Sequence, residues 1–293
     1  MIRVRNGDVE LAVEVFGEGP PLLFAHGLSA NRRVTLKELS PLTDRFRVIA
    51  FDQRGHGEST PIEDSRLYDP EAMAQDMAAI LDHLRIERAI VGGESMGAAT
   101  ALLFARAHPE RVEALLLVAP AFGAEPNPDR RRFLGLGDEI DREGFEGFLA
   151  NSAERLRTRF GAPPEVVRYI GAMHRTHRPE SLSTAFHTVP NWIVSEDLSA
   201  LVSRRTPVGL VAWEGDPTHP MALARRLAAA GGNQSRLEEI ASPLALFADP
   251  PIIGRTLAKL LAWSVSRPSK SRQRTCSRLP QRRKPSDGRS NRS

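Results

Sequence analysis

The pentapeptide Gly93-Glu94-Ser95-Met96-Gly97 is the feature of this chain that most constrains its fold. It follows an apolar, strand-like run at 88–92 and precedes a helix-like run at 98–108. A G-x-S-x-G pattern between a strand and a helix is typical of a strained turn, on which side chains at the glycine positions would clash with neighbouring backbone. The pattern therefore predicts that Ser95 is held exposed at the end of a strand.

The rest of the chain alternates strand-like with helix-like segments. Short apolar runs predict strands, and the apolar residues of 70–84 recur at helical spacing. This alternation predicts an α/β fold with a mostly parallel, doubly wound sheet. The other predicted strands are 10–16, 21–26, 47–52, 112–119, 207–213 and 236–240, and the predicted helices are 70–84, 220–230 and 252–263.

The segment 122–205 interrupts the alternation. It is helix-like and punctuated by prolines, so we expect a helical cap inserted into a core made of residues 1–121 and 206–263. Its large apolar side chains either line a pocket over Ser95 or pack the cap against the sheet. They are Phe133, Phe145, Phe148, Phe160, Tyr169, Met173, Phe186 and Trp192.

Three motifs occur in a fixed order along the chain. The sequence His26-Gly27-Leu28-Ser29 follows one predicted strand, Asp52-Gln53-Arg54-Gly55-His56-Gly57-Glu58-Ser59 follows the next, and the serine pentapeptide follows a third. This order resembles the α/β-hydrolase superfamily over roughly residues 1–263. The resemblance implies that Ser95 is a catalytic nucleophile, and that the backbone N–H groups of Leu28 and Met96 form an oxyanion hole. We expect His56 to be a structural member of its turn.

The resemblance also places a catalytic carboxylate after the strand predicted at 207–213. Asp216 fits that position, and the order serine, aspartate, histidine along the chain favours it. The alternative is an aspartate that only caps the helix predicted at 220–230 or forms the turn ahead of it.

The histidine that should complete a catalytic triad is missing from its usual place. Similar proteins carry it in the loop after the final strand, but residues 241–250 contain no histidine and none follows His219. Because a triad is defined by geometry rather than by sequence position, His219, three residues after Asp216, is the first candidate for the base. The other candidates, all in the insert, are His174, His177 and His187.

These residues predict an enzyme that hydrolyses a carboxylic ester, a lactone or a related acyl compound through Ser95. The expected substrate is a medium-sized, largely apolar small molecule, and no cofactor or metal is implied, since His174 and His177 lack the further ligands of a metal site. Two alternatives stay open. Positioning and oxyanion donors also suit a non-hydrolytic cyclase, lyase or isomerase, and an inactive relative without a base would only bind a ligand.

Charge is distributed unevenly along the chain. Ten of the 40 Lys and Arg residues but one of the 36 Asp and Glu residues lie in 264–293, which gives this segment a net charge of +9 and the remainder −5. The polar composition of 264–293 predicts a disordered tail. We expect a solvated tail rather than one that binds nucleic acid.

Composition also limits the cellular setting. Cys276 is the only cysteine, so the chain forms neither an intrachain disulfide nor a cysteine-based zinc site. No apolar run approaches the ~20 residues of a membrane span. Residues 1–8 lack the apolar core of a signal peptide, which favours a cytoplasmic protein.

Overall fold

The computed structural model describes residues 1–241 and 248–265, and its centre is one sheet of eight strands. The strands are β1 (Ile2–Asn6), β2 (Val9–Phe16), β3 (Pro21–Ala25), β4 (Arg47–Phe51), β5 (Ala89–Glu94), β6 (Val112–Val118), β7 (Val208–Ala212) and β8 (Ser235–Glu239). Their order across the sheet is β1-β2-β4-β3-β5-β6-β7-β8. The β1/β2 and β2/β4 pairs are antiparallel, and all other neighbours are parallel.

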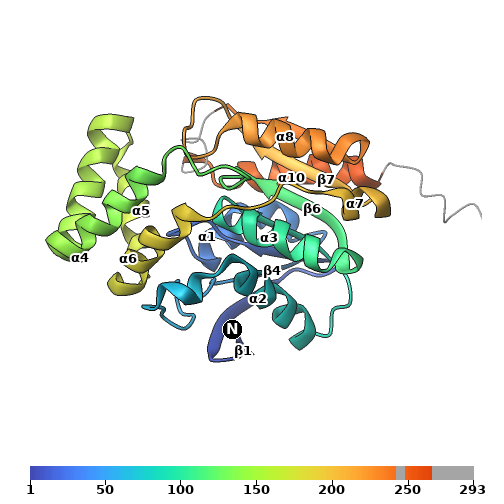
Figure 1. Ribbon diagram of the computed structural model, residues 1–293, viewed down its shortest axis with the longest axis horizontal. Coiled ribbons are helices and arrows are strands. Elements are labelled where there is room, and N and C mark those ends of the chain that lie inside the picture. Colours follow the sequence, from blue (N-terminus) through green and yellow to red (C-terminus); the bar gives the residue numbers. More distant parts are fainter. Residues whose placement is uncertain (242–247, 266–293) are drawn as a thin grey trace, which may run out of the picture.

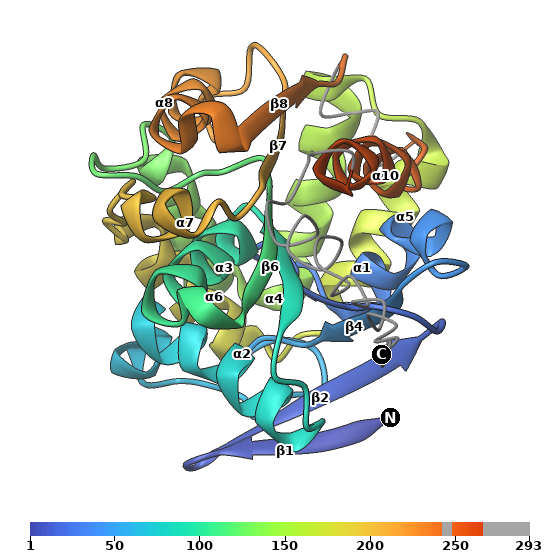
Figure 2. The same ribbon diagram turned by 90° about the vertical axis from the view of Figure 1, so that its right-hand side faces the viewer.

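Both faces of the sheet are covered by helices. In β6, Leu115 and Leu117 join one hydrophobic cluster while Leu116 and Val118 join another, because successive side chains of a strand point to opposite faces. The first cluster is covered by α2 (Pro70–His83), α3 (Met96–Ala107), α7 (Ser199–Arg204) and α8 (Met221–Gly231), and the second by α1 (Arg32–Glu38) and α10 (Ile252–Val265). Figure 2 shows these two helix layers on either side of the strands. The predicted doubly wound, mostly parallel sheet is confirmed.

The strands and helices predicted outside the insert occur within two residues of their expected bounds. The sequence patterns missed β1 and α1. Only Val4 of β1 is buried, as expected of a strand at the edge of a sheet. Helix α1 has no clear apolar pattern and is started by its N-cap residue. The side-chain oxygen of Asn31 accepts hydrogen bonds from the N–H groups of Arg33 and Val34.

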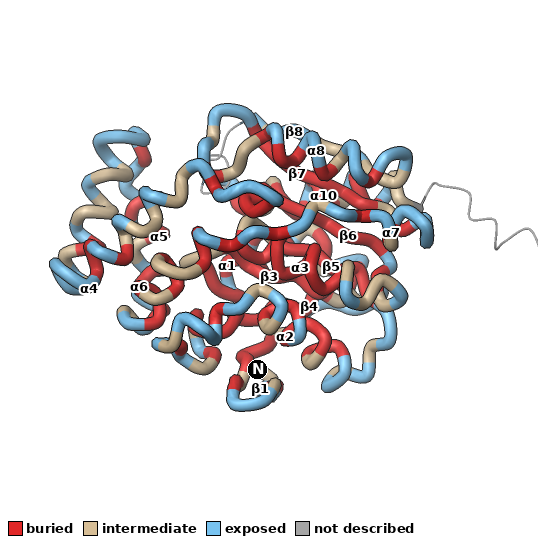
Figure 3. The backbone as a smooth tube through the Cα atoms, in the orientation of Figure 1, coloured by how far each residue is buried: buried red, intermediate tan, exposed pale blue. Residues whose placement is uncertain are grey.

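The segment between β6 and β7 is mainly helical, as predicted. It contains α4 (Arg130–Phe160), which kinks at Gly144 (φ 71°), α5 (Pro164–His174) and α6 (Pro179–Thr188). These helices extend from one end of the sheet, on the left of Figure 1, and much of α4 and α5 is exposed or half-buried in Figure 3. Leu28 packs against a small apolar cluster that α4 and α6 share. The division of the chain into a core and a separate cap stays a prediction.

Two predicted segments lie partly or wholly outside the described residues. These are the loop after β8, at 242–247, and the basic tail, from residue 266 on. Within the described ranges, no helix combines the length and apolarity needed to cross a membrane. Short 3-10 turns complete the fold: η1 (Ser40–Leu42), η2 (Ser65–Tyr68), η3 (Pro109–Arg111), η4 (Val189–Asn191) and η5 (Gly232–Gln234).

Candidate active site

Ser95 occupies a strained turn between β5 and α3. Its backbone has φ 53° and ψ −108°, a conformation that a non-glycine residue seldom adopts. A Cβ atom at Gly93 would overlap the carbonyl of Gly97, and one at Gly97 would overlap the carbonyl of Ala25. The two glycines of the pentapeptide are therefore required for the serine to sit at this corner, at the carboxyl edge of the sheet.

The loop after β7 brings Asp216 and His219 together. One oxygen of Asp216 accepts a hydrogen bond from the N–H of Thr218 at 2.9 Å, and the other accepts from Trp213 Nε1 at 2.9 Å. The first bond folds the loop into a tight turn of the kind that aspartate favours. His219 Nδ1 then lies 2.7 Å from Asp216 Oδ2, with the His219 ring packed edge-on against the Trp213 ring at 5.5 Å.

His219 also contacts Ser95, which lies 124 residues earlier in the chain. The distance between His219 Nε2 and Ser95 Oγ is 2.9 Å. Because Nδ1 faces a carboxylate, which only accepts, it carries the ring proton, and Nε2 is free to accept from the serine hydroxyl. The structure thus joins serine, imidazole and carboxylate in one hydrogen-bonded line.

The electrostatics of Asp216 favour its ionised form. Burial opposes ionisation, but hydrogen bonds from His219, Trp213 and the Thr218 N–H outweigh it and hold the pKa of this carboxyl well below its usual range. Two neighbouring carboxyls behave differently: burial raises the pKa of Glu94 and, together with the Glu94 charge, that of Glu38. Asp216 is therefore the carboxylate that faces the imidazole as an anion.

The residues expected to form an oxyanion hole are Met96, which directly follows Ser95, and Leu28, whose neighbour Gly27 lies near Ser95. Met96 is the first residue of α3, so its N–H has no partner within the helix. Gly27, which precedes Leu28, lies so near that a Cβ placed on it would be 3.5 Å from Ser95 Cβ. In the described part of the chain, the Leu28 N–H donates to no loop carbonyl.

A second set of contacts holds the loop that carries His219. Asn127 is buried, and its Nδ2 donates both to the carbonyl of Thr218 at 2.8 Å and to that of Ala121 at 2.7 Å. Thr218 Oγ1 donates to Asp129 Oδ2 at 2.6 Å. The sequence analysis missed Asn127 and Asp129, because their partner is 91 and 89 residues away and neither belongs to a local motif.

Three histidines near the same edge of the sheet have both ring nitrogens engaged by backbone. His26 bonds the carbonyl of Gly27 and the N–H of Gln53. His56 bonds the carbonyl of Arg54 and, at 3.4 Å, the N–H of Ser29, which fits the structural role expected of it. His177, one of the alternative bases, accepts from the N–H of Gly57 at 3.1 Å and donates to the carbonyl of Ser29 at 2.8 Å.

The other two alternative bases also lie in different surroundings from Ser95. His187 contacts Asp141 at 3.1 Å on the exposed side of α6. His174 is buried beside the Phe148 ring, and its Nδ1 has no hydrogen-bond partner among the described residues. In the described ranges, no cluster of three or more His, Cys, Asp and Glu side chains is placed to hold a metal ion.

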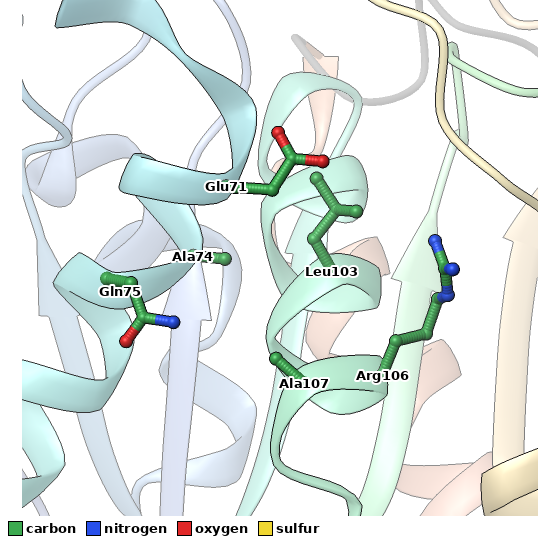
Figure 4. A pocket seen from close by; sticks show the side chains of 6 residues that line it. All are labelled: Glu71, Ala74, Gln75, Leu103, Arg106 and Ala107. Atoms are coloured by element: carbon green, nitrogen blue, oxygen red, sulfur yellow. The ribbon is translucent and has the colours of Figure 1, made fainter.

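Two cavities differ in their relation to this site. One, of about 420 Å³, lies among α4, α5 and α6 and reaches Ser29, next to Leu28. The other, of about 250 Å³, lies between α2 and α3, where Glu71, Ala74 and Gln75 face Leu103, Arg106 and Ala107 (Figure 4). Leu103 is seven residues, or about 10 Å, along α3 from Met96, so the second cavity is remote from Ser95.

Comparison with known proteins places this arrangement in a family. The family model described as alpha/beta hydrolase fold matches residues 20–247. The 2-(acetamidomethylene)succinate hydrolase of Mesorhizobium japonicum is 31% identical over 55% of this chain and 62% of its own length. The pimeloyl-[acyl-carrier protein] methyl ester esterase of Aeromonas hydrophila is 30% identical over 70% and 72%, respectively.

A solved structure agrees with these sequence matches. The thermophilic esterase of Thermogutta terrifontis superposes with a TM-score of 0.73 at 26% identity, over 90% of this chain and 98% of its own. Some other curated relatives are matched over a smaller part of their own length, 56% for one and 45% for another. Family model, relatives and fold agree with the three sequence motifs, and the chain belongs to the alpha/beta hydrolase fold family.

Proposed function

We propose that this protein is a serine hydrolase of carboxylic esters or lactones, with Ser95 as nucleophile, His219 as base and Asp216 as the group that orients the imidazole. The observation that carries the proposal is the His219 ring, which lies 2.9 Å from Ser95 Oγ and 2.7 Å from Asp216 Oδ2. Both distances are those of direct hydrogen bonds.

The proposed reaction has two stages. Ser95 Oγ attacks the carbonyl carbon while its proton passes to His219 Nε2, and the N–H groups of Leu28 and Met96 stabilise the resulting oxyanion. The C–O bond to the leaving alcohol breaks, the alcohol oxygen takes the proton from His219, and an acyl-serine remains. A water molecule then gives a proton to His219 and attacks the acyl-serine, which releases the carboxylic acid and returns the proton to Ser95.

Named relatives support this reaction class. They include a methyl ester esterase and, at 34% identity over 39% of this chain, a 3-oxoadipate enol-lactonase of Acinetobacter baylyi. Leu28 packs against the apolar cluster that α4 and α6 share, and α5 follows α4 along the chain. We infer that these three helices form the cap that covers the reacting carbonyl and selects a small, largely apolar substrate.

Hydrolysis of p-nitrophenyl butyrate and of a simple lactone by the purified protein tests the proposal. We expect turnover that Ser95→Ala removes, whereas Ser203→Ala, which changes an exposed serine of α7, leaves it unchanged. Turnover that persists in Ser95→Ala at the wild-type rate would exclude the covalent mechanism and favour a reaction that depends on positioning alone.

A further inference from the structure

The loop after β3, which carries the proposed oxyanion donor, is a tight turn with one strained residue. The N–H of Ala30 donates to the carbonyl of Gly27 at 3.1 Å, which closes a four-residue turn. Leu28 and Ser29 are its two central residues. Ser29 has φ 64°, in the left-handed region that turns usually fill with glycine. A serine keeps this conformation only where the surrounding contacts hold it there.

Two buried histidines bond the backbone of Ser29, one at each of its polar groups. The Ser29 N–H donates to Nε2 of His56, in the loop after β4, at 3.4 Å. The Ser29 carbonyl accepts from Nε2 of His177, which lies in the insert between α5 and α6, at 2.8 Å. The first bond is long for a hydrogen bond, so His177 supplies the stronger polar restraint on the strained residue.

His177 is itself held in place on its other side. Its Nδ1 accepts from the N–H of Gly57 at 3.1 Å, so Nε2 carries the ring proton and donates to Ser29. Burial lowers the pKa of His177 to about 4, so the ring stays neutral at pH 7. The His177 N–H also donates to the carbonyl of His174 at 3.0 Å, which fixes the connection after α5. His177 is therefore a fixed donor aimed at the oxyanion turn.

The direction of the Leu28 N–H depends on the shape of this turn. The Leu28 nitrogen shares a planar peptide with the Gly27 carbonyl, which is anchored by His26 Nδ1 at 2.8 Å. In turns without a positive φ at the third position, the peptide between the two central residues points the opposite way. If Ser29 returned to a negative φ, that peptide would reverse and Leu28 would move relative to Ser95.

We propose that His177 is a positioning residue of the oxyanion hole: through its bond to the Ser29 carbonyl, the insert holds the turn in the shape that aims the Leu28 N–H at the reacting carbonyl. His177 acts through Ser29 and not on the substrate. The inference rests on the proposed hydrolase function and adds to it a residue of the insert.

Two amide variants of His177 test the inference. In His177→Asn the amide oxygen can replace Nδ1 as the acceptor for Gly57, but the shorter side chain does not reach Ser29. We expect kcat for p-nitrophenyl butyrate to fall by about 100-fold with KM little changed, because an oxyanion donor acts mainly in the transition state and small misplacements are costly. His177→Gln puts an N–H donor near the position of Nε2, so it should keep kcat within about tenfold of the wild type.

Thr176→Val is the matched control on the neighbouring residue. Thr176 Oγ1 accepts from Asn31 Nδ2 at 3.0 Å, which also links the insert to the segment after β3 but does not involve Ser29. This variant should keep kcat within about threefold of the wild type. An equal loss of kcat in Thr176→Val and His177→Asn would mean that any loosening of the insert lowers activity, and would overturn the role given to His177.

Two further measurements separate positioning from a loss of stability. Butylboronic acid mimics the tetrahedral intermediate, so its Ki for His177→Asn should rise by the same factor as kcat/KM falls. Ser29→Gly allows a positive φ without strain, so in that background His177→Asn should lower kcat by less than about tenfold. A loss that stays at about 100-fold in the Ser29→Gly background would show that His177 does not act through the conformation of Ser29.

The outcomes also distinguish this inference from the proposed function. A folded His177→Asn with kcat within about threefold of the wild type would overturn the inference and leave the hydrolase function standing. His177→Leu, which lacks both bonds, takes the place of His177→Asn with the same expectations if the latter does not fold.

If the wild type hydrolyses no ester, the proposed function fails, and hydrogen exchange decides the inference. Backbone amides of a peptide that spans 27–30 should then exchange at least about tenfold faster in His177→Asn than in the wild type and in Thr176→Val. Equal exchange in the three proteins would reject the role of His177.

Discussion

Two groups of histidines lie at the carboxyl edge of the same sheet, and they differ in what their ring nitrogens contact. In the first group, His219 has a carboxylate at one nitrogen and the hydroxyl of Ser95 at the other. In the second, the rings of His26, His56 and His177 lie in a row, the first pair tilted and the second edge-on, with centroids 5.1 and 5.2 Å apart, and their nitrogens contact backbone groups.

The difference separates a catalytic arrangement from a structural one. A base needs one nitrogen held by an orienting group and the other free to exchange a proton with the reacting atom. His219 meets both conditions. The three histidines of the second group instead cross-link the loops after β3 and β4 to the segment after α5, since His177 bonds both Gly57 and Ser29. Burial lowers the pKa values of all three and keeps them neutral.

The largest expected effect comes from removing the ring of His219. His219→Ala should lower kcat for ester hydrolysis by on the order of 10⁵ to 10⁶, because the serine hydroxyl loses its base while the oxyanion donors remain. His177→Gln, which removes a ring of the second group, should keep kcat within about tenfold of the wild type. Steady-state kinetics of both variants measure the contrast. Equal losses in the two would erase the distinction between the groups.

The carboxylate that orients His219 should have the next largest effect. Asp216→Asn keeps the shape of the side chain but removes the charge, so we expect kcat to fall by about 10⁴, as for other triads. The hydrogen bond from Trp213 Nε1 to the side-chain oxygen can persist in this variant. A loss of less than about tenfold would mean that Asp216 only caps its turn, the alternative that the sequence left open.

Replacing Asn127 should lower kcat less, because Asn127 acts only by positioning the loop that carries His219. Asn127→Ala removes both bonds that tie the Thr218 carbonyl to Ala121. We expect kcat to fall by about 10- to 100-fold with KM little changed, and the free energy of unfolding to fall by about 1–3 kcal/mol. Asn127→Asp keeps the shape but lacks the donors, so it should not restore kcat. Full activity in Asn127→Ala would show that the turn around Asp216 positions His219 unaided.

The smallest expected effect concerns the pH dependence of stability. The pKa of His177 is about 4 in the fold, chiefly through burial, against about 6.5 for an unfolded chain. As pH falls below about 6.5, the unfolded state takes up a proton that the folded state refuses, so wild-type stability falls. His177→Gln lacks this proton uptake. The amount by which its free energy of unfolding lies below that of the wild type should therefore shrink by on the order of 2 kcal/mol between pH 7.5 and pH 5.

Urea unfolding of both proteins across this pH range measures that difference. Glu38 and Glu94, whose pKa values are raised by burial, change stability in the opposite direction, but they are present in both proteins and cancel in the comparison. A deficit that stays constant with pH would mean that His177 titrates normally in the fold.

The local parts of this site could be predicted from the sequence, and the long-range parts could not. Ser95 is recognisable because Gly93 and Gly97 are required within two residues of it. His219 could be proposed as the base because it lies only three residues from Asp216. In the fold, β6 was predictable because it is apolar on both faces, whereas β1 and α1 carry too many charged residues for a clear pattern.

Other features depend on contacts that no sequence spacing encodes. Asn127 meets Thr218 across 91 residues, and His177 meets Ser29 across 148. The sequence offered His177 as a possible base and gave no sign that backbone groups occupy both of its nitrogens. The buried position of His174 beside Phe148 likewise depends on how α4 and α5 pack.

The pairing of His219 with Ser95 is the central claim, and labelling with a fluorophosphonate probe tests it most directly. The probe reacts with an activated serine, and intact mass with peptide mapping locates the adduct. We expect stoichiometric labelling of Ser95 in the wild type and in His187→Ala, which changes a half-buried histidine of α6 paired with Asp141, and none in His219→Ala. Labelling of Ser95 in His219→Ala at the wild-type rate would contradict the account and show that another group activates the serine.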